Sequence, residues 1–234
     1  MKIWLDDCVL NWYINGTVGS PSEENIQECY DYFNYAESLI DDFDDKFHIQ
    51  DCIKNLKYVV DKRIKQLERI YDFRSYFPRK HILETYKQLG IVKGFVITKL
   101  FIIRNNIEHN ELEYSDKEQC HDLLDTVWYF LKSTDDLVYE ANVDNTLYNN
   151  LDNGRQWIEI NVETPKINVA SIRGIINVNL ISRKPINNFL MIDEADVLDD
   201  KEDLVYIRGN IVLDNNIKVS LAKKFFINKI LNHG

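Results

Sequence analysis

The chain has 234 residues and a formal net charge of −10, with 45% hydrophobic and 28% charged residues. This length allows one large or two small domains with a sizeable core, and the composition is that of a globular protein. No apolar stretch reaches transmembrane length, and the acidic N-terminus lacks the apolar region of a signal peptide. We therefore expect a cytoplasmic chain with no membrane partner.

Cofactor and metal motifs are absent from the sequence. The four cysteines are far apart, without a Cys-x-x-Cys pair, which disfavours a zinc site or a disulfide framework. No Gly-rich phosphate loop and no His-Glu-x-x-His motif occurs. His48, His81 and His121 have no ligand-like spacing and are interpreted as structural. We expect neither a cofactor nor a bound metal.

Helical patterns dominate residues 1–142. The stretch SPSEEN predicts a helix start, with Ser20 as N-cap and Pro21 at the first helical position. Apolar residues at helical spacing and local stop signals predict four more helices, at residues 52–71, 79–89, 95–109 and 115–138.

The composition and the hydrophobic pattern of the sequence change after about residue 142. Residues 143–155 are polar and rich in turn formers, so we expect a linker there. Beyond it, alternating apolar residues predict strands that include residues 158–162, 176–180 and 217–221. The segment 223–231 fits either a strand or a helix. The expected fold class is α+β: an N-terminal all-α bundle over residues 1–142, then a small, mostly antiparallel β domain over residues 156–234.

The charges are unevenly distributed along the chain. Residues 53–104 hold 13 Lys and Arg against 4 Asp and Glu, whereas the flanking blocks are strongly acidic. Such a block is typical of a phosphate-binding surface. Its helix offers a candidate RNA-backbone surface made of Lys54, Lys57, Lys62, Arg63, Lys65 and Arg69. The alternative is that these cations pair with acidic residues on neighbouring helices.

One motif carries possible chemistry: IIRNNIEHN, at residues 102–110. On a helix, Arg104, Asn105 and His109 fall within an arc of about 140°. A guanidinium can hold phosphoryl oxygens and offset the charge that grows on them, and a histidine can transfer protons near neutral pH. The alternative is a structural helix end, with an Arg104–Glu108 ion pair and a histidine favoured by the helix dipole.

This motif, in a helical domain of this length, resembles the HEPN superfamily (higher eukaryotes and prokaryotes nucleotide-binding). The resemblance covers roughly residues 20–140. It implies a metal-independent endoribonuclease of toxin or phage-defence type, which cleaves RNA by attack of the 2′-hydroxyl. It further implies a homodimer whose motif helices meet in one composite site, with Arg104 and His109 as the catalytic pair and Asn105 as an auxiliary polar group.

A second interpretation is a non-catalytic HEPN-like binding or regulatory protein that acts through protein partners. Glu108, Glu111 and Glu113 surround the histidine and would repel RNA. Glu111 also stands where one HEPN subgroup has the tyrosine that its antitoxin modifies. A protein partner or an antitoxin of another kind is compatible with the sequence.

Overall fold

The computed structural model describes residues 1–6, 13–20, 26–42, 46–108, 117–139, 142–150, 155–162, 167, 170–186, 189–199 and 203–231. The chain divides into two compact units. The sheet unit comprises Met1–Ser20 and Asn142–Asn228, and the helical unit comprises Pro21–Ala141 and Lys229–Gly234. The fold is thus mixed α+β, as the sequence predicts.

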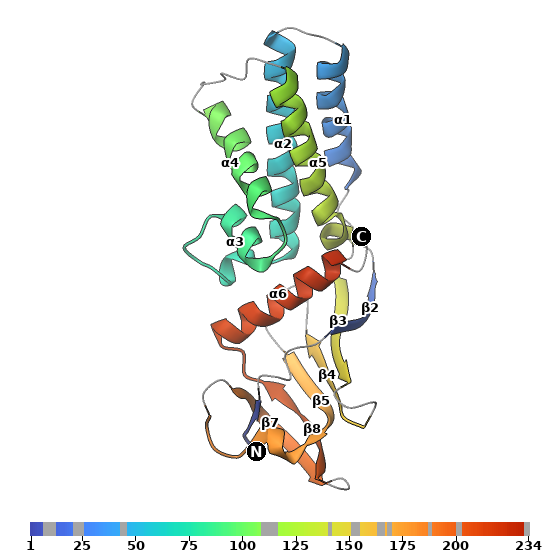
Figure 1. The fold of residues 1–234 in the computed structure, drawn as a ribbon, viewed down its shortest axis with the longest axis vertical. Coiled ribbons are helices and arrows are strands. Elements are labelled where there is room, and N and C mark those ends of the chain that lie inside the picture. Colours follow the sequence, from blue (N-terminus) through green and yellow to red (C-terminus); the bar gives the residue numbers. More distant parts are fainter. Residues whose placement is uncertain are drawn as a thin grey trace. The chain divides into compact units, whose positions relative to one another are not determined.

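The sheet unit is built on eight described strands, all paired antiparallel in the order β2-β3-β4-β5-β8-β7-β1-β6 (Figure 1). Their bounds are β1 Ile3–Asp6, β2 Tyr13–Ser20, β3 Asn142–Asn150, β4 Trp157–Val162, β5 Ala170–Asn177, β6 Ile181–Ser182, β7 Phe189–Asp199 and β8 Leu204–Ile211. One face is apolar and buried because side chains alternate along each strand, as Ile158, Ile160 and Val162 do on β4.

The helical unit is inserted between two paired strands of the sheet. Strand β2 ends at Ser20, β3 begins at Asn142, and these two residues are direct partners in the ladder. The chain therefore leaves the sheet and returns to it at neighbouring backbone positions. The sequence boundary at residue 142 marks the return, while residues 1–20 belong to the sheet unit rather than to the helical one.

The helical unit contains helices α1 Gln27–Asp42, α2 Lys46–Ile70, α3 Ile82–Leu89, α4 Gly94–Glu108 and α5 Lys117–Tyr139, with a short 3₁₀ turn η2 at Phe73–Ser75. Helix α2 packs against α1, α4 and α5, and α3 packs against α4 (Figure 1). The residues that α2 buries, from Ile49 to Ile70, recur every three or four positions, so one side of the helix forms the centre of the unit's core.

Local signals set the ends of α3. His81 occupies the N-cap with extended backbone angles, and its ring accepts a hydrogen bond from the backbone N–H of Leu83. Gly90 ends the helix in the left-handed conformation, with φ 79°, which glycine adopts without steric strain. The predicted helix end at Gly90 and the helix predicted after Gly94 are both confirmed.

Four segments differ from the sequence predictions. The strand predicted at residues 176–180 is wrong in part, because β5 ends at Asn177 and Val178–Leu180 form a 3₁₀ turn, η3. The strand predicted at residues 217–221 is wrong: these residues belong to α6, Asn215–Leu231. Asp214 caps this helix by accepting from the N–H of Ile217, and the buried residues that follow recur at helical spacing: Leu221, Ala222, Phe225 and Phe226. A turn signal and a helix cap share the same residue types, so the pattern alone misassigns them.

The other two differences lie where the helical unit joins the sheet. Ser20 is the last residue of β2 rather than a helix N-cap, and the first described helix begins at Gln27. The expected linker, residues 143–155, contains most of β3. Asparagine and aspartate disfavour strands, but pairing with β2 on one side and β4 on the other supplies backbone hydrogen bonds that outweigh this preference.

Two glycine substitutions test the packing of the two units. A Cβ added at Gly174 of β5 would lie 2.2 Å from the Trp157 carbonyl oxygen, and one added at Gly94 of α4 would lie 3.5 Å from Lys87 Cε. We expect Gly174→Ala to destabilise the protein by about 1–3 kcal/mol or more, because backbone must shift. Gly94→Ala should be neutral or stabilise by up to about 1 kcal/mol. Urea denaturation followed by circular dichroism measures both, and equal effects would contradict the register of β4 and β5.

Candidate functional site

Two of the three motif residues, Arg104 and Asn105, lie near the C-terminal end of α4. Arg104 and Asn105 are part of this helix, whose residues Val96, Leu100 and Ile103 are buried in the core of the helical unit. The side chains of Arg104 and Asn105 lie outside the described part of the structure, and so does the whole of His109. The backbone thus places the motif at the C-terminal part of a packed bundle helix.

The basic residues of α2 separate into two groups. Lys54 and Lys65 are exposed, as is Arg69, while Lys57 and Lys62 are half-buried. Two of the exposed or half-buried lysines have acidic partners, because Lys62 pairs with Glu28 at 2.7 Å and Lys54 pairs with Asp51 at 2.9 Å. The alternative left open by the sequence is that the cations pair with acidic neighbours. This pairing therefore explains some of the cations of α2.

Arg63 forms the second group alone, because its side chain is fully buried. Arg63 is not exposed to solvent, so its inclusion in the predicted RNA-backbone surface is wrong. The helical spacing contains the signal: Arg63 lies seven residues after Leu56 and four before Leu67, among residues that are all buried. At 100° per residue, the other five cations lie about 100–180° away from Arg63 around the helix.

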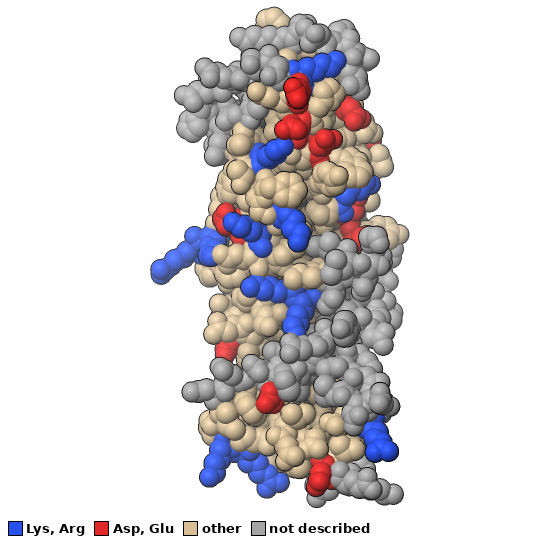
Figure 2. Space-filling model, in the orientation of Figure 1, with Lys and Arg blue, Asp and Glu red and all other residues tan. Residues whose placement is uncertain are grey.

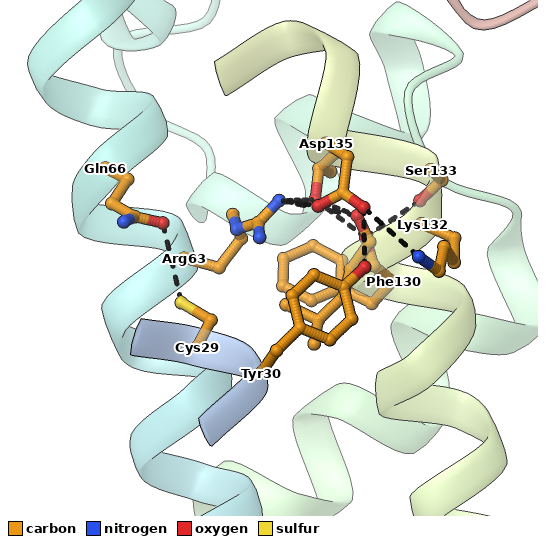
Figure 3. A network of polar contacts seen from close by, with 10 residues as sticks. Cys29, Tyr30, Arg63, Gln66, Phe130, Lys132, Ser133 and Asp135 are labelled. Carbon is orange, nitrogen blue, oxygen red and sulfur yellow. Dashed lines mark hydrogen bonds and ion pairs between the residues drawn. The ribbon is translucent and has the colours of Figure 1, made fainter. Parts of the chain in front are cut away.

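The buried guanidinium joins three helices through one carboxylate (Figure 3). Arg63 Nη1 donates to Asp135 Oδ1 at 2.8 Å and to Thr134 Oγ1 at 3.1 Å, both on α5. The Tyr30 hydroxyl of α1 donates to Asp135 Oδ2 at 2.5 Å. Lys132 lies 3.7 Å from the same carboxylate and 4.6 Å from the centre of the Tyr30 ring. Asp135 thus ties α1, α2 and α5 together.

This buried cluster is a structural element of the bundle. Within the described residues, Arg63 Nε and Nη2 have no hydrogen-bond partner, so the site relies on Asp135 for its charge balance. Burial raises the pKa of the neighbouring Cys29 thiol, and the positive charge of Arg63 offsets this only in part. A guanidinium with no exposed surface cannot reach a substrate, so the cluster holds the helices together rather than binding a ligand.

The sheet unit carries a polar groove on the face opposite its buried one. The groove has a volume of about 620 Å³ and is lined by residues of β4, β5, β7 and β8. Ladder partners form a row of charges across these strands, in the order Glu159, Arg173, Arg208 and Asp196. Arg173 binds both carboxylate oxygens of Glu159 at 2.8 Å. The charged residues that line the groove are two bases, Arg173 and Arg208, and two acids, Glu194 and Asp196, so the groove has no excess of either charge.

Among the described residues, no helix is long and apolar enough to cross a membrane. No group of three or more His, Cys, Asp or Glu side chains among these residues is placed to hold a metal ion.

The chain matches no protein-family model, no curated protein and no solved structure. Its function therefore has to be argued from its own residues.

We expect substitutions of the two partners in the Arg63–Asp135 pair to destabilise the protein by different amounts. Asp135→Ala would leave a fully buried cation without its partner, and we expect a loss of about 3–5 kcal/mol. Arg63→Met removes that cation and leaves Asp135, 19% exposed, with Tyr30 and Lys132. Its loss should be smaller by at least about 1 kcal/mol. Urea denaturation gives both values, and equal losses would mean that the pair does not carry a buried charge.

The environment of the Tyr30 hydroxyl predicts that the protein loses stability at alkaline pH. Burial raises the pKa of its hydroxyl well above the ordinary value, and the hydrogen bond to Asp135 and the charge of that carboxylate raise it further. The stabilisation is fully present below the unfolded pKa of about 10 and is lost as the pH rises above it. We expect the free energy of unfolding to fall less steeply above pH 10 in Tyr30→Phe than in the wild type. Parallel pH profiles would exclude this role.

Proposed function

We propose that this protein is a metal-independent endoribonuclease of toxin or phage-defence type. The placement of the motif supports this function: Arg104 and Asn105 lie near the C-terminal end of α4, a helix that packs against α2, α3 and α5. The next helix along the chain, α5, completes the bundle. This order of a motif helix followed by a final bundle helix is what the HEPN resemblance implies.

The proposed reaction uses the RNA's own 2′-hydroxyl as the nucleophile. The hydroxyl attacks the adjacent phosphorus, the bond to the 5′-oxygen breaks, and a 2′,3′-cyclic phosphate remains. His109 takes the proton from the nucleophile or returns one to the leaving oxygen, and Arg104 stabilises the charge on the phosphoryl oxygens. Asn105 helps to orient the phosphate through its amide.

Two chains would supply one site. Residues five apart on a straight helix point in directions about 140° apart, so Arg104 and His109 of one helix do not converge. A homodimer in which two α4 helices meet would bring Arg104 of one protomer to His109 of the other. A protein partner or antitoxin would then act by blocking or rearranging this interface.

The acidic residues around the motif support a second candidate, a non-catalytic binding protein. Glu108, Glu111 and Glu113 would oppose the approach of a phosphodiester. In that case the motif would stabilise the bundle, and function would depend on protein contacts.

RNA cleavage in the presence of EDTA tests the catalytic proposal. We expect products that end in a cyclic phosphate, and a loss of activity of about a hundred-fold or more in both Arg104→Ala and His109→Ala. Lys184→Ala, an exposed substitution in the sheet unit, serves as the control and should retain activity. Cleavage that survives both motif substitutions would reject the site, and a folded wild type without any cleavage would favour the binding protein.

A further inference from the structure

A basic groove lies between the end of α2 and the start of α3. It has a volume of about 310 Å³, and its charged lining consists of Glu68 together with Arg74, Lys80 and His81. No acidic residue occurs in the chain between Arg74 and His81, whereas Arg79 adds another cation. Figure 2 shows Lys and Arg side chains gathered over the α3 part of the helical unit on this face. The groove is therefore a concentrated part of the basic block.

The imidazole of His81 has a defined orientation in this groove. Its Nδ1 accepts a hydrogen bond from the backbone N–H of Leu83 at 3.3 Å, which caps α3. An accepting Nδ1 carries no proton, so Nε2 of the neutral ring is a hydrogen-bond donor. The side chain is exposed, and a ligand in the groove can reach it.

His81 also connects the groove to the motif helix. Its ring contacts the ring of Phe101 on α4, with centroids 4.7 Å apart. Phe101 precedes Arg104 by three residues and Asn105 by four, which places all three backbone positions on one side of α4. The rise from Phe101 to Arg104 is about 4.5 Å along the helix axis. The groove thus adjoins the helix side that carries the motif.

The two cations of the groove are available to a ligand. The Arg74 side chain is 81% exposed, and Glu68 is its partner, through Nε at 3.2 Å. A guanidinium bound through Nε keeps further N–H donors for a second anion. Lys80 is exposed and lies 5.3 Å from the centre of the Phe77 ring. These donors, with Nε2 of His81, match the oxygens of a phosphodiester.

We propose that this groove binds a backbone phosphate of single-stranded RNA beside the phosphate that the motif cleaves. The choice of RNA rests on the proposed function, whereas the groove itself rests on the contacts of Arg74, Lys80 and His81. Arg74 and Lys80 supply the charge and His81 supplies a directed hydrogen bond. The groove would hold the strand so that the next phosphate lies along α4.

Binding of a fluorescently labelled single-stranded RNA oligonucleotide to the full chain tests this proposal. We expect the charge reversals Arg74→Glu and Lys80→Glu together to weaken binding by about ten-fold or more and to reduce its salt dependence. The matched control reverses Arg183 and Lys184, exposed residues of the sheet unit, which changes the net charge equally, and should weaken binding much less. Equal weakening by both pairs, or unchanged binding by the groove pair, would overturn the proposal.

A third variant separates recognition from folding. His81→Asn keeps a side-chain acceptor that caps α3, so the melting temperature should stay close to that of the wild type. It removes the imidazole donor, and RNA affinity should fall about five-fold. Unchanged affinity in a folded His81→Asn protein would remove His81 from the site.

The two proposals fail in different ways. If the wild type binds RNA through the groove but cleaves none, the catalytic proposal fails and the groove stands. If cleavage depends on Arg104 and His109 while the groove pair changes neither binding nor KM, the groove proposal fails alone. A wild type that binds no RNA overturns the groove.

Discussion

The pairing of β2 with β3 is the constraint on which the chain's organisation depends. Ser20 and Asn142 are neighbours in one ladder, although about half of the chain lies between them. Backbone hydrogen bonds between strands therefore hold both ends of the helical unit at one place in the sheet. Bringing the two ends of this segment together costs entropy, although the cost grows only slowly with length, and the ladders from β2 through β3 to β4 offset it.

A second constraint acts inside the helical unit. Asp135 contacts the buried Arg63 and the Tyr30 hydroxyl, so one carboxylate links α1, α2 and α5 in addition to their apolar packing. Buried charge pairs add little net stability, but breaking one is strongly destabilising. This arrangement favours a single packing of the bundle. It also removes one cation from the basic block, so the phosphate-binding capacity of that block depends on the cations that remain exposed.

Sequence patterns predicted the elements whose neighbours are local. The glycines at positions 90 and 94 bound α3 and α4, and alternation predicted β4, because each signal is a property of a few consecutive residues. Strand β3 was missed because its polar residues are held by partners distant in sequence. Arg63 was grouped with surface cations although its spacing relative to Leu56 and Leu67 places it among buried residues. The many Lys and Arg residues of α2 suggested an exposed basic surface, whereas the position of Arg63 along the helix would have indicated that it is buried.

By itself, the sequence determined the α+β class, several helix boundaries and the presence of Arg104 and Asn105 near the end of an apolar helix. The tertiary structure alone decided that strands β1 and β2 join the sheet, that Arg63 is buried, and that His81 lies against Phe101 of the motif helix. The physical reason is the range of the interactions. Capping and periodicity act within a few residues, whereas strand pairing, burial of charge and ring contacts join residues that only the folded chain brings together.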